Sequence, residues 1–270
     1  MQSVLFWFAT TLYAVSTLLF FVWIGFRKEG ASTWAVRAAA SGLVPHAMTL
    51  ALRWKEVGHG PFSTRYEVIS SNAMLLVGIF LLAMVWAKSL KSLGIFIMPI
   101  AFLGMGWSVS TFGVKADVPI IFKSYWLYLH IGFAKAFGVT ALLAAACAAA
   151  FLVRSRNPKR LSKLPSRLRL DLYSHQFLLV SFLCLGVMIV AGSLWAHQSW
   201  GRYWAWDPIE TSSLVTWLVF GVVLHFRVIH RWSARRMAWL TFVALAFALA
   251  TVYVVVLVVP SIHNAYMVGR

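Results

Sequence analysis

The sequence is poor in acidic residues and in cysteine. Its 270 residues include seven Asp and Glu and two Cys, and charged side chains make up 11% of the chain. An ordinary soluble domain has about a quarter of its residues charged, so this class of protein is excluded. Cys147 and Cys184 lie inside apolar runs and form no CxxC pair, so no dithiol for metal binding or disulfide exchange is expected.

Apolar side chains dominate what remains. They make up 61% of the residues, and the mean hydropathy is +0.80. A membrane-spanning helix needs about 20 mainly apolar residues. Breaking the chain at its charged clusters predicts spans near 3–25, 36–53, 68–87, 92–109, 124–153, 172–196, 210–229 and 237–260. We therefore expect an all-α polytopic membrane bundle of about eight transmembrane helices, forming a single membrane domain over residues 1–270.

The basic residues predict how the bundle is oriented. The net charge is +17, but the Lys and Arg residues lie in short clusters between apolar runs, which favours contact with a lipid bilayer over nucleic-acid binding. Fifteen of the 24 fall in the alternating segments around 27–37, 88–91, 154–169 and 231–236. Positively charged loops stay on the cytoplasmic side of a membrane. Both termini, and the loop after the sixth span, are therefore expected outside.

That outer loop, WAHQSWGRYWAWDPIET, is unusually rich in tryptophan. An aromatic belt at the membrane interface would explain one or two of these side chains, but not their combination with a glycine and an Asp-Pro turn. Large rigid rings and a glycine that permits close approach suit a platform for a planar apolar macrocycle. The platform residues are Trp195, Trp200, Gly201, Trp204, Trp206 and Asp207. Capping of the seventh span is an alternative role for Asp207 and Glu210.

WGRYWAWDPIET resembles the WWD signature of haem-handling membrane proteins. Its flanks GSLWA and LVTWLVFGVVLHFR, and HAMTLALRWKEVGHGPFSTRYE at 46–67, are similar to cytochrome c assembly proteins of the system II, CcsA or ResC, type. This resemblance implies that the chain binds haem b (iron protoporphyrin IX) and moves it from the cytoplasmic side to the outer loop. There the haem would be presented for thioether attachment to the CxxCH segment of an apocytochrome c.

The resemblance also implies partners and a location. The chain would be the haem-handling part of a cytochrome c synthase complex, with a ResB- or CcsB-type membrane protein as its partner. The membrane would be a bacterial inner (plasma) membrane, or a thylakoid membrane if the protein is plastid-encoded. Thioether formation needs mainly proximity and orientation, and the sequence offers no obvious nucleophile, so catalysis by this chain itself stays open.

Histidine is the usual axial donor to haem iron. His130 and His263 lie at the outer ends of the fifth and eighth spans, and the resemblance implies that they ligate haem at the outer loop. His46 and His225 lie in the middle or inner part of the membrane, where the resemblance implies a second haem-ligating pair. Arg202, in the loop, is the preferred candidate for the haem propionates. Lys135 and Arg227, within the fifth and seventh spans, are the other candidates, with snorkelling to the interface as their alternative role. The alternative for each histidine is an interfacial or hydrogen-bonded core residue.

Three other functions fit parts of the sequence. The chain could be a haem carrier or regulator of the same family without ligation activity. A cytochrome b-like electron carrier would want paired histidines across a four-helix core, and the outer tryptophan loop argues against it. A transporter of another amphipathic ligand is the third alternative, because spans alone do not name a substrate.

Overall fold

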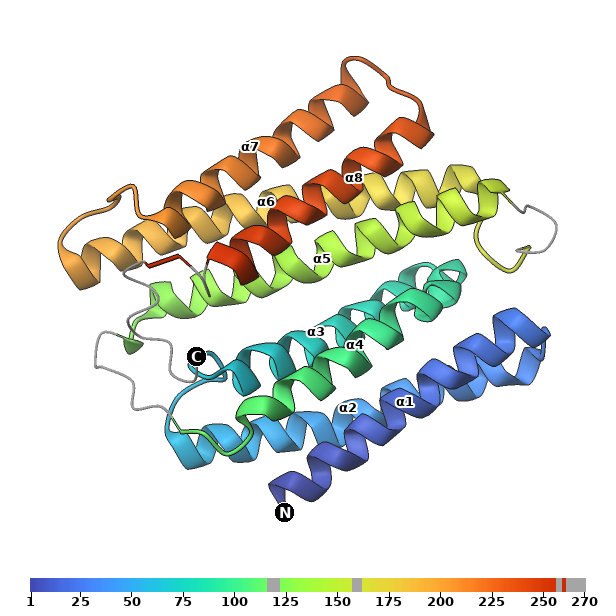
Figure 1. The fold of residues 1–270 in the computed structure, drawn as a ribbon, viewed down its shortest axis with the longest axis horizontal. Coiled ribbons are helices and arrows are strands. Elements are labelled where there is room, and N and C mark those ends of the chain that lie inside the picture. Colours follow the sequence, from blue (N-terminus) through green and yellow to red (C-terminus); the bar gives the residue numbers. More distant parts are fainter. Residues whose placement is uncertain (116–121, 157–161, 256–258, 261–270) are drawn as a thin grey trace. The chain divides into compact units, whose positions relative to one another are not determined.

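Eight α-helices make up most of the described chain, which comprises residues 1–115, 122–156, 162–255 and 259–260 of a computed structural model (Figure 1). The helices are α1 (Gln2–Phe26), α2 (Glu29–Val57), α3 (Arg65–Trp86), α4 (Gly94–Ser108), α5 (Tyr125–Arg156), α6 (Arg167–Trp200), α7 (Pro208–Val228) and α8 (Ala234–Leu249). Short 3₁₀ segments flank α4, at Lys88–Leu93 and Val109–Thr111, and a π-helical segment, Ala250–Val255, continues α8. The all-α fold predicted from the sequence is confirmed.

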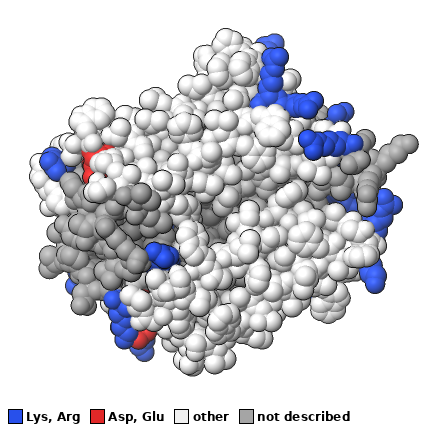
Figure 2. All heavy atoms as spheres, viewed as in Figure 1, with Lys and Arg blue, Asp and Glu red and all other residues white. Residues whose placement is uncertain are grey.

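The helices have the length and composition of membrane spans. Within the described residues, seven of them, some extended by their flanking segments, are long and apolar enough to cross a bilayer. The remaining helix, α2, does not meet this criterion, because polar side chains such as Arg37, His46 and Arg53 interrupt its apolar sequence. Many large apolar side chains are exposed, as lipid-facing positions require, and uncharged side chains predominate on the face shown in Figure 2. The chain is a multi-pass membrane protein.

Contacts divide the helices into two compact units, and each is described by itself. The first unit contains α1 to α4 and the described residues of the 156–166 segment, and the second contains α5 to α8. In the first unit, α1 packs against α2 and α4, and α3 packs against the same two helices. The single membrane domain expected from the sequence stays a prediction.

A buried ion pair joins α2 to α3 in the first unit. Arg53 Nε lies 2.9 Å from Glu67 Oε1, and their side chains are 2% and 0% exposed. The second carboxylate oxygen of Glu67 accepts the backbone N–H groups of Ser63 and Thr64, and the Thr64 hydroxyl accepts the N–H of Glu67 in a capping box that begins α3. Arg53 also donates to the carbonyl of Val114. The pair therefore fixes how the segment between α2 and α3 is folded.

The other end of the first unit is held by the basic segment before α6. Lys163 Nζ lies 2.5 Å from Glu29 Oε1, and the indole N–H of Trp23 donates to the other oxygen of Glu29 at 3.1 Å. These two hydrogen bonds, that of Lys163 first, lower the pKa of Glu29. Lys163 and Lys91 also lie over the Trp23 ring. Part of the basic loop is thus tied to α1 and α2.

The second unit has an apolar core crossed by a few hydrogen bonds. The core is formed by Phe137, Ala141, Ala144, Leu178, Leu185, Met188, Phe220, Val223, Met237, Ala244 and Ala248. The Thr140 and Ser181 hydroxyls lie 2.8 Å apart between α5 and α6. Those of Thr216 and Thr251 lie 2.7 Å apart between α7 and the π-helical segment. Such bonds between helices help to hold membrane bundles together, since lipid gives apolar helix faces little reason to associate.

Candidate functional site

The tryptophan loop is a tight connection between α6 and α7. Gly201 ends α6 with a φ of 74°, a left-handed conformation that suits glycine, and its N–H donates to the carbonyl of His197. At the other end, Asp207 caps α7, accepting the N–H of Ile209 at 2.9 Å, with Pro208 as the first helical residue. The cap that the sequence suggested for Asp207 and Glu210 is confirmed.

One residue in this loop has an unusual backbone. Trp206 has a φ of 58°, and its side chain is 69% exposed. The amides on either side of it, from Ala205 and Asp207, both donate to Glu210 Oε2, at 2.8 and 3.2 Å. A bulky residue in the left-handed region is strained and persists only where its surroundings hold it. The two hydrogen bonds to Glu210 stabilise this conformation, and the indole of Trp206 lies at the protein surface.

The aromatic rings of the loop lie in three pairs. Trp195 is 3% exposed and packs edge-on against Trp200, with ring centroids 4.9 Å apart. Trp204 and Trp206 are perpendicular, with centroids 5.7 Å apart. Tyr203 stacks on His197, at 4.1 Å between centroids and 10° between planes. Trp195 therefore supports the loop from inside, while Trp206 and Tyr203 offer aromatic surface.

A hollow lies beneath this loop and is lined by α5, α6, α7 and the loop itself. It holds about 380 Å³ of space between the atoms, part of it open to solvent. Its lining combines aromatic and polar side chains, including those of His130, Tyr203, Trp204, Glu210 and Ser213. The structure thus brings one predicted histidine and one predicted tryptophan to the same cavity.

The orientation of His130 is set by a backbone carbonyl. Its Nδ1 lies 2.9 Å from the oxygen of Met188 on α6. A carbonyl oxygen only accepts, so Nδ1 carries the hydrogen, and in the neutral ring the lone pair is then on Nε2. Histidines that ligate metals commonly donate their other N–H to a carbonyl or carboxylate in this way. The donor chemistry of this side chain therefore fits an axial ligand of haem.

Other predicted residues of the outer site have different surroundings. His263 lies outside the described residues. Arg202 is exposed. Asp207 is 8% exposed, and its carboxylate is engaged at the start of α7. Of the outer set, the structure places His130 and Trp204 at the hollow and Trp206 at the surface of the same loop.

The two histidines expected deeper in the membrane belong to different units. His46 is fully buried in the first unit, where Nδ1 lies 3.1 Å from the Tyr13 hydroxyl and Nε2 lies 2.9 Å from the Ser70 hydroxyl. These bonds join α1, α2 and α3. His225, in the second unit, is exposed, and its ring centroid lies 5.3 Å from that of His230. Both ring nitrogens of His46 are thus already hydrogen-bonded.

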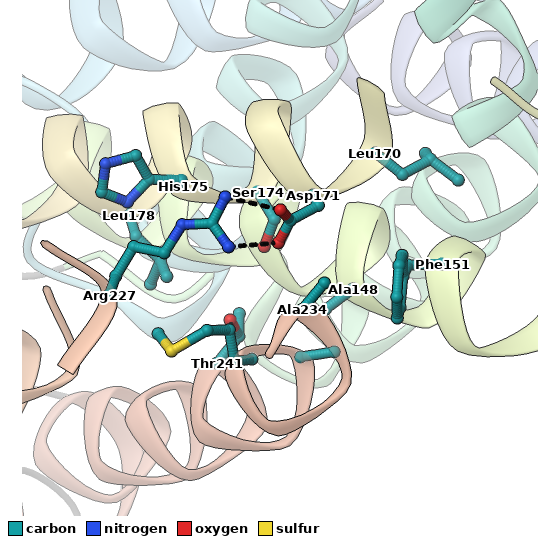
Figure 3. A pocket seen from close by; sticks show the side chains of 12 residues that line it. Ala148, Phe151, Leu170, Asp171, Ser174, His175, Leu178, Arg227, Ala234 and Thr241 are labelled. Atoms are coloured by element: carbon teal, nitrogen blue, oxygen red, sulfur yellow. Dashed lines mark hydrogen bonds and ion pairs between the residues drawn. The ribbon is translucent and has the colours of Figure 1, made fainter. Parts of the chain in front are cut away.

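A second hollow, of about 290 Å³, lies between the opposite ends of α5 to α8 in the same unit (Figure 3). Arg227 on α7 reaches across it and donates to both carboxylate oxygens of Asp171 on α6, at 2.9 and 2.5 Å. His175 lies on the same side as Arg227, and the rest of the lining is mostly apolar. The guanidinium is therefore occupied by an internal carboxylate.

Tyr203 and Met188 are among the contributors to the site that were not singled out in the sequence. Tyr203 stands within the tryptophan-rich loop, so its role in the hollow could have been suspected from its position. Met188 contributes only its carbonyl oxygen to His130, and no side-chain pattern signals such a role. The role of the Met188 carbonyl can be seen only in the folded structure.

The fold and the hollow define a polytopic membrane protein with an aromatic, histidine-containing site at one end of a four-helix unit. Residues 38–263 match the model of the Cytochrome C assembly protein family, and the chain belongs to this family. The resemblance to CcsA-type proteins found in the sequence is confirmed, and the chain functions in cytochrome c biogenesis.

Individual relatives agree with this assignment. The chain is 28% identical over 268 residues to the cytochrome c biogenesis protein CcsA of Trieres chinensis, a match covering 86% of this chain and 84% of the relative. It is 26% identical to CcsA of Crocosphaera subtropica, over 71% of this chain and 75% of the relative. A solved structure of the cytochrome c haem lyase CcmF matches 93% of this chain and 45% of its own, with a TM-score of 0.69 and 15% identity. This last likeness shows the fold alone.

Proposed function

We propose that the hollow beneath the tryptophan loop holds haem b and presents it to an apocytochrome c. The observation that carries this proposal is the geometry of His130, whose Nδ1 is tethered to a backbone carbonyl beside an aromatic cavity. In this tautomer Nε2 carries the lone pair and would be the nitrogen that coordinates iron. Trp204 in the lining and Trp206 at the surface supply flat apolar faces suited to a porphyrin. Trp195, Trp200 and Gly201 give the loop its form.

His263 is proposed as the second axial ligand of this outer haem. Support comes from the family resemblance and from the position of His263 after the eighth span, at the end of the chain expected to face outward. Two axial histidines would limit oxidation of the iron. Arg202, exposed in the loop, is proposed to pair with a haem propionate. Asp207 is proposed to hold the start of α7 against the haem.

The proposed reaction is the addition of two cysteine thiols of CxxCH to the two haem vinyl groups. In each addition, sulfur bonds to the vinyl carbon next to the ring and the thiol hydrogen ends on the terminal carbon, so no oxidant or leaving group is needed. The role of this chain is to orient the haem and to exclude water from it, which turns the addition into a proximity-driven step. The thiols come from the apocytochrome.

We further propose an inner haem site at His46 and His225, from which haem passes to the outer loop. Both histidines belong to predicted spans, where ionisable residues tend to be functional. Ligation by His46 requires iron to replace its hydrogen bond to Tyr13 or to Ser70.

The proposal includes a partner and an orientation. A ResB- or CcsB-type membrane protein would complete the synthase. Both termini and the tryptophan loop would face the outside of a bacterial inner membrane, or the lumen of a thylakoid. The basic segments at 154–169 and 231–236 support this orientation, since cytoplasmic loops carry the excess of Lys and Arg.

The test is a reduced-minus-oxidised visible spectrum of the chain purified in mild detergent. We expect a low-spin haem signal that His130→Ala and His263→Ala each reduce to the share of the inner site, and that the exposed-histidine control His230→Ala retains in full. Absence of haem from the wild type under every condition would overturn the proposal. So would a signal that His130→Ala leaves unchanged.

A haem carrier or regulator without ligation activity is the second candidate, because every feature of the hollow serves binding alone equally well. The two are separated by supplying a CxxCH peptide to the haem-loaded chain together with its ResB- or CcsB-type partner. Covalent haem on the peptide supports the synthase. Release of haem without thioether formation supports the carrier.

A further inference from the structure

We propose that Gly192 on α6 is a positioning residue for His130, acting together with the carbonyl of Met188. The inference rests on the proposed haem-binding role of His130. It explains why the imidazole ring of this residue has its orientation. Gly192 does not contact the ligand in this scheme. It acts by leaving a space that the imidazole occupies.

The space is visible in the distances around Gly192. A Cβ atom added there would lie 2.6 Å from His130 Nδ1 and 2.9 Å from His130 Cε1. Carbon atoms do not approach ring atoms this closely, so any side chain at position 192 must displace the imidazole or move α6 away from α5. The imidazole is the side chain of a half-buried residue in the second turn of α5.

The Met188 carbonyl explains why the ring comes so close. In an α-helix the N–H of residue 192 donates to the carbonyl of residue 188, so residue 192 stands directly beside that oxygen. Most carbonyls inside a helix are shielded by the side chain of the residue four positions later. Because position 192 has no side chain, His130 Nδ1 reaches the Met188 oxygen at 2.9 Å. One missing Cβ thus permits the hydrogen bond that sets the tautomer of His130.

Other glycines in the same unit do not have this relationship. A Cβ at Gly186 would meet Trp217 at 3.1 Å, and one at Gly221 would meet Phe182 at 3.3 Å, which are contacts that a small shift relieves. Gly132 on α5, two residues after His130, has nothing within 4 Å of its Cβ position. Gly132→Ala is therefore a matched control, the same chemical change on the helix that carries His130.

The first experiment measures the melting temperature of the haem-free chain in detergent for Gly192→Ala, His130→Ala and the double variant. We expect Gly192→Ala to lower the melting temperature when His130 is present, and to lower it much less in the His130→Ala background, where the clashing ring is gone. Gly132→Ala should not lower it and should raise it slightly, since alanine is the better helix former and nothing crowds its Cβ. Should Gly192→Ala fail to accumulate, the double variant should still do so. Equal losses in both backgrounds would overturn the inference.

The second experiment reads the ligand itself. In the haem-loaded chain, Gly192→Ala should reduce or shift the low-spin signal, while Gly132→Ala keeps it. If the chain proves to bind no haem, the proposed function fails but the coupling between Gly192 and His130 in the haem-free melts still stands. If haem binds and Gly192→Ala leaves its spectrum unchanged, the positioning role fails while the proposed function survives.

Discussion

The Glu210 carboxylate accepts the backbone N–H of Ala205, a residue five positions earlier, across the strained Trp206. The same oxygen accepts the N–H of Asp207, so a single side chain holds the backbone N–H groups of the two residues that flank Trp206. The same carboxylate therefore takes part in the cap of α7 and holds Trp206 at the protein surface. Disturbing the cap should disturb the aromatic surface.

Replacing Glu210 tests this coupling. Glu210→Ala removes both hydrogen bonds, and we expect a loss of about 1–2 kcal/mol, typical of a helix cap, together with a severalfold loss of bound haem. Glu210→Gln keeps an acceptor oxygen and should retain most of both. Thermal melts and haem content per chain are the measurements. Full haem content in Glu210→Ala would show that the loop keeps its conformation without the two hydrogen bonds to Glu210.

The strain at Trp206 predicts a difference between two replacements. Trp206→Gly and Trp206→Ala both remove the indole, so both should lower haem retention equally. Only glycine is relaxed at a φ of 58°, and a left-handed residue with a Cβ costs about 1–2 kcal/mol, so the glycine variant should melt at a higher temperature than the alanine variant. Equal melting temperatures would mean that the backbone there is not strained.

Much of the helical architecture was readable because membrane spans are long and apolar. The predicted span at 172–196 lies inside α6, and that at 3–25 lies inside α1. Boundaries were harder, because polar residues continue a helix beyond its apolar stretch. The helix α2 runs from Glu29 to Val57, although only 36–53 was predicted as a span. Backbone hydrogen bonds extend helices past the hydrocarbon core without any apolar signal.

The residues of the site could be predicted only where their side chains stand out in the sequence. The four tryptophans and the Asp207-Pro208 turn stand out in the sequence, and His130 was found through family resemblance. The contacts that orient His130 could not be predicted, because they depend on the carbonyl oxygen of Met188 and on the missing side chain of Gly192. Nor does the sequence tell that both nitrogens of His46 are bonded, since Tyr13 and Ser70 are distant along the chain.

Those two bonds make His46 testable as a ligand. If His46 ligates the inner haem, His46→Ala should remove that haem, while Ser70→Ala, which releases Nε2, should retain or increase it. Haem content and the low-spin spectrum in a His130→Ala background, which isolates the inner site, are the measurements. Unchanged haem with a lowered melting temperature in His46→Ala would instead make His46 a structural link between α1, α2 and α3.

The Arg53–Glu67 pair predicts how the first unit responds to charge removal. Arg53→Met leaves a buried carboxylate without its partner, at an expected cost of about 3–5 kcal/mol, a large part of the stability of a typical domain. Adding Glu67→Gln removes the orphaned charge and keeps an acceptor for the Ser63 and Thr64 amides, so the double variant should recover much of the loss. Lys115→Met is the control, because its ion pair with Glu56 is exposed to solvent and should contribute little to stability. Melting temperatures of the four proteins decide the matter, and a double variant no more stable than Arg53→Met would show that packing of the guanidinium, rather than its charge, holds α2 to α3.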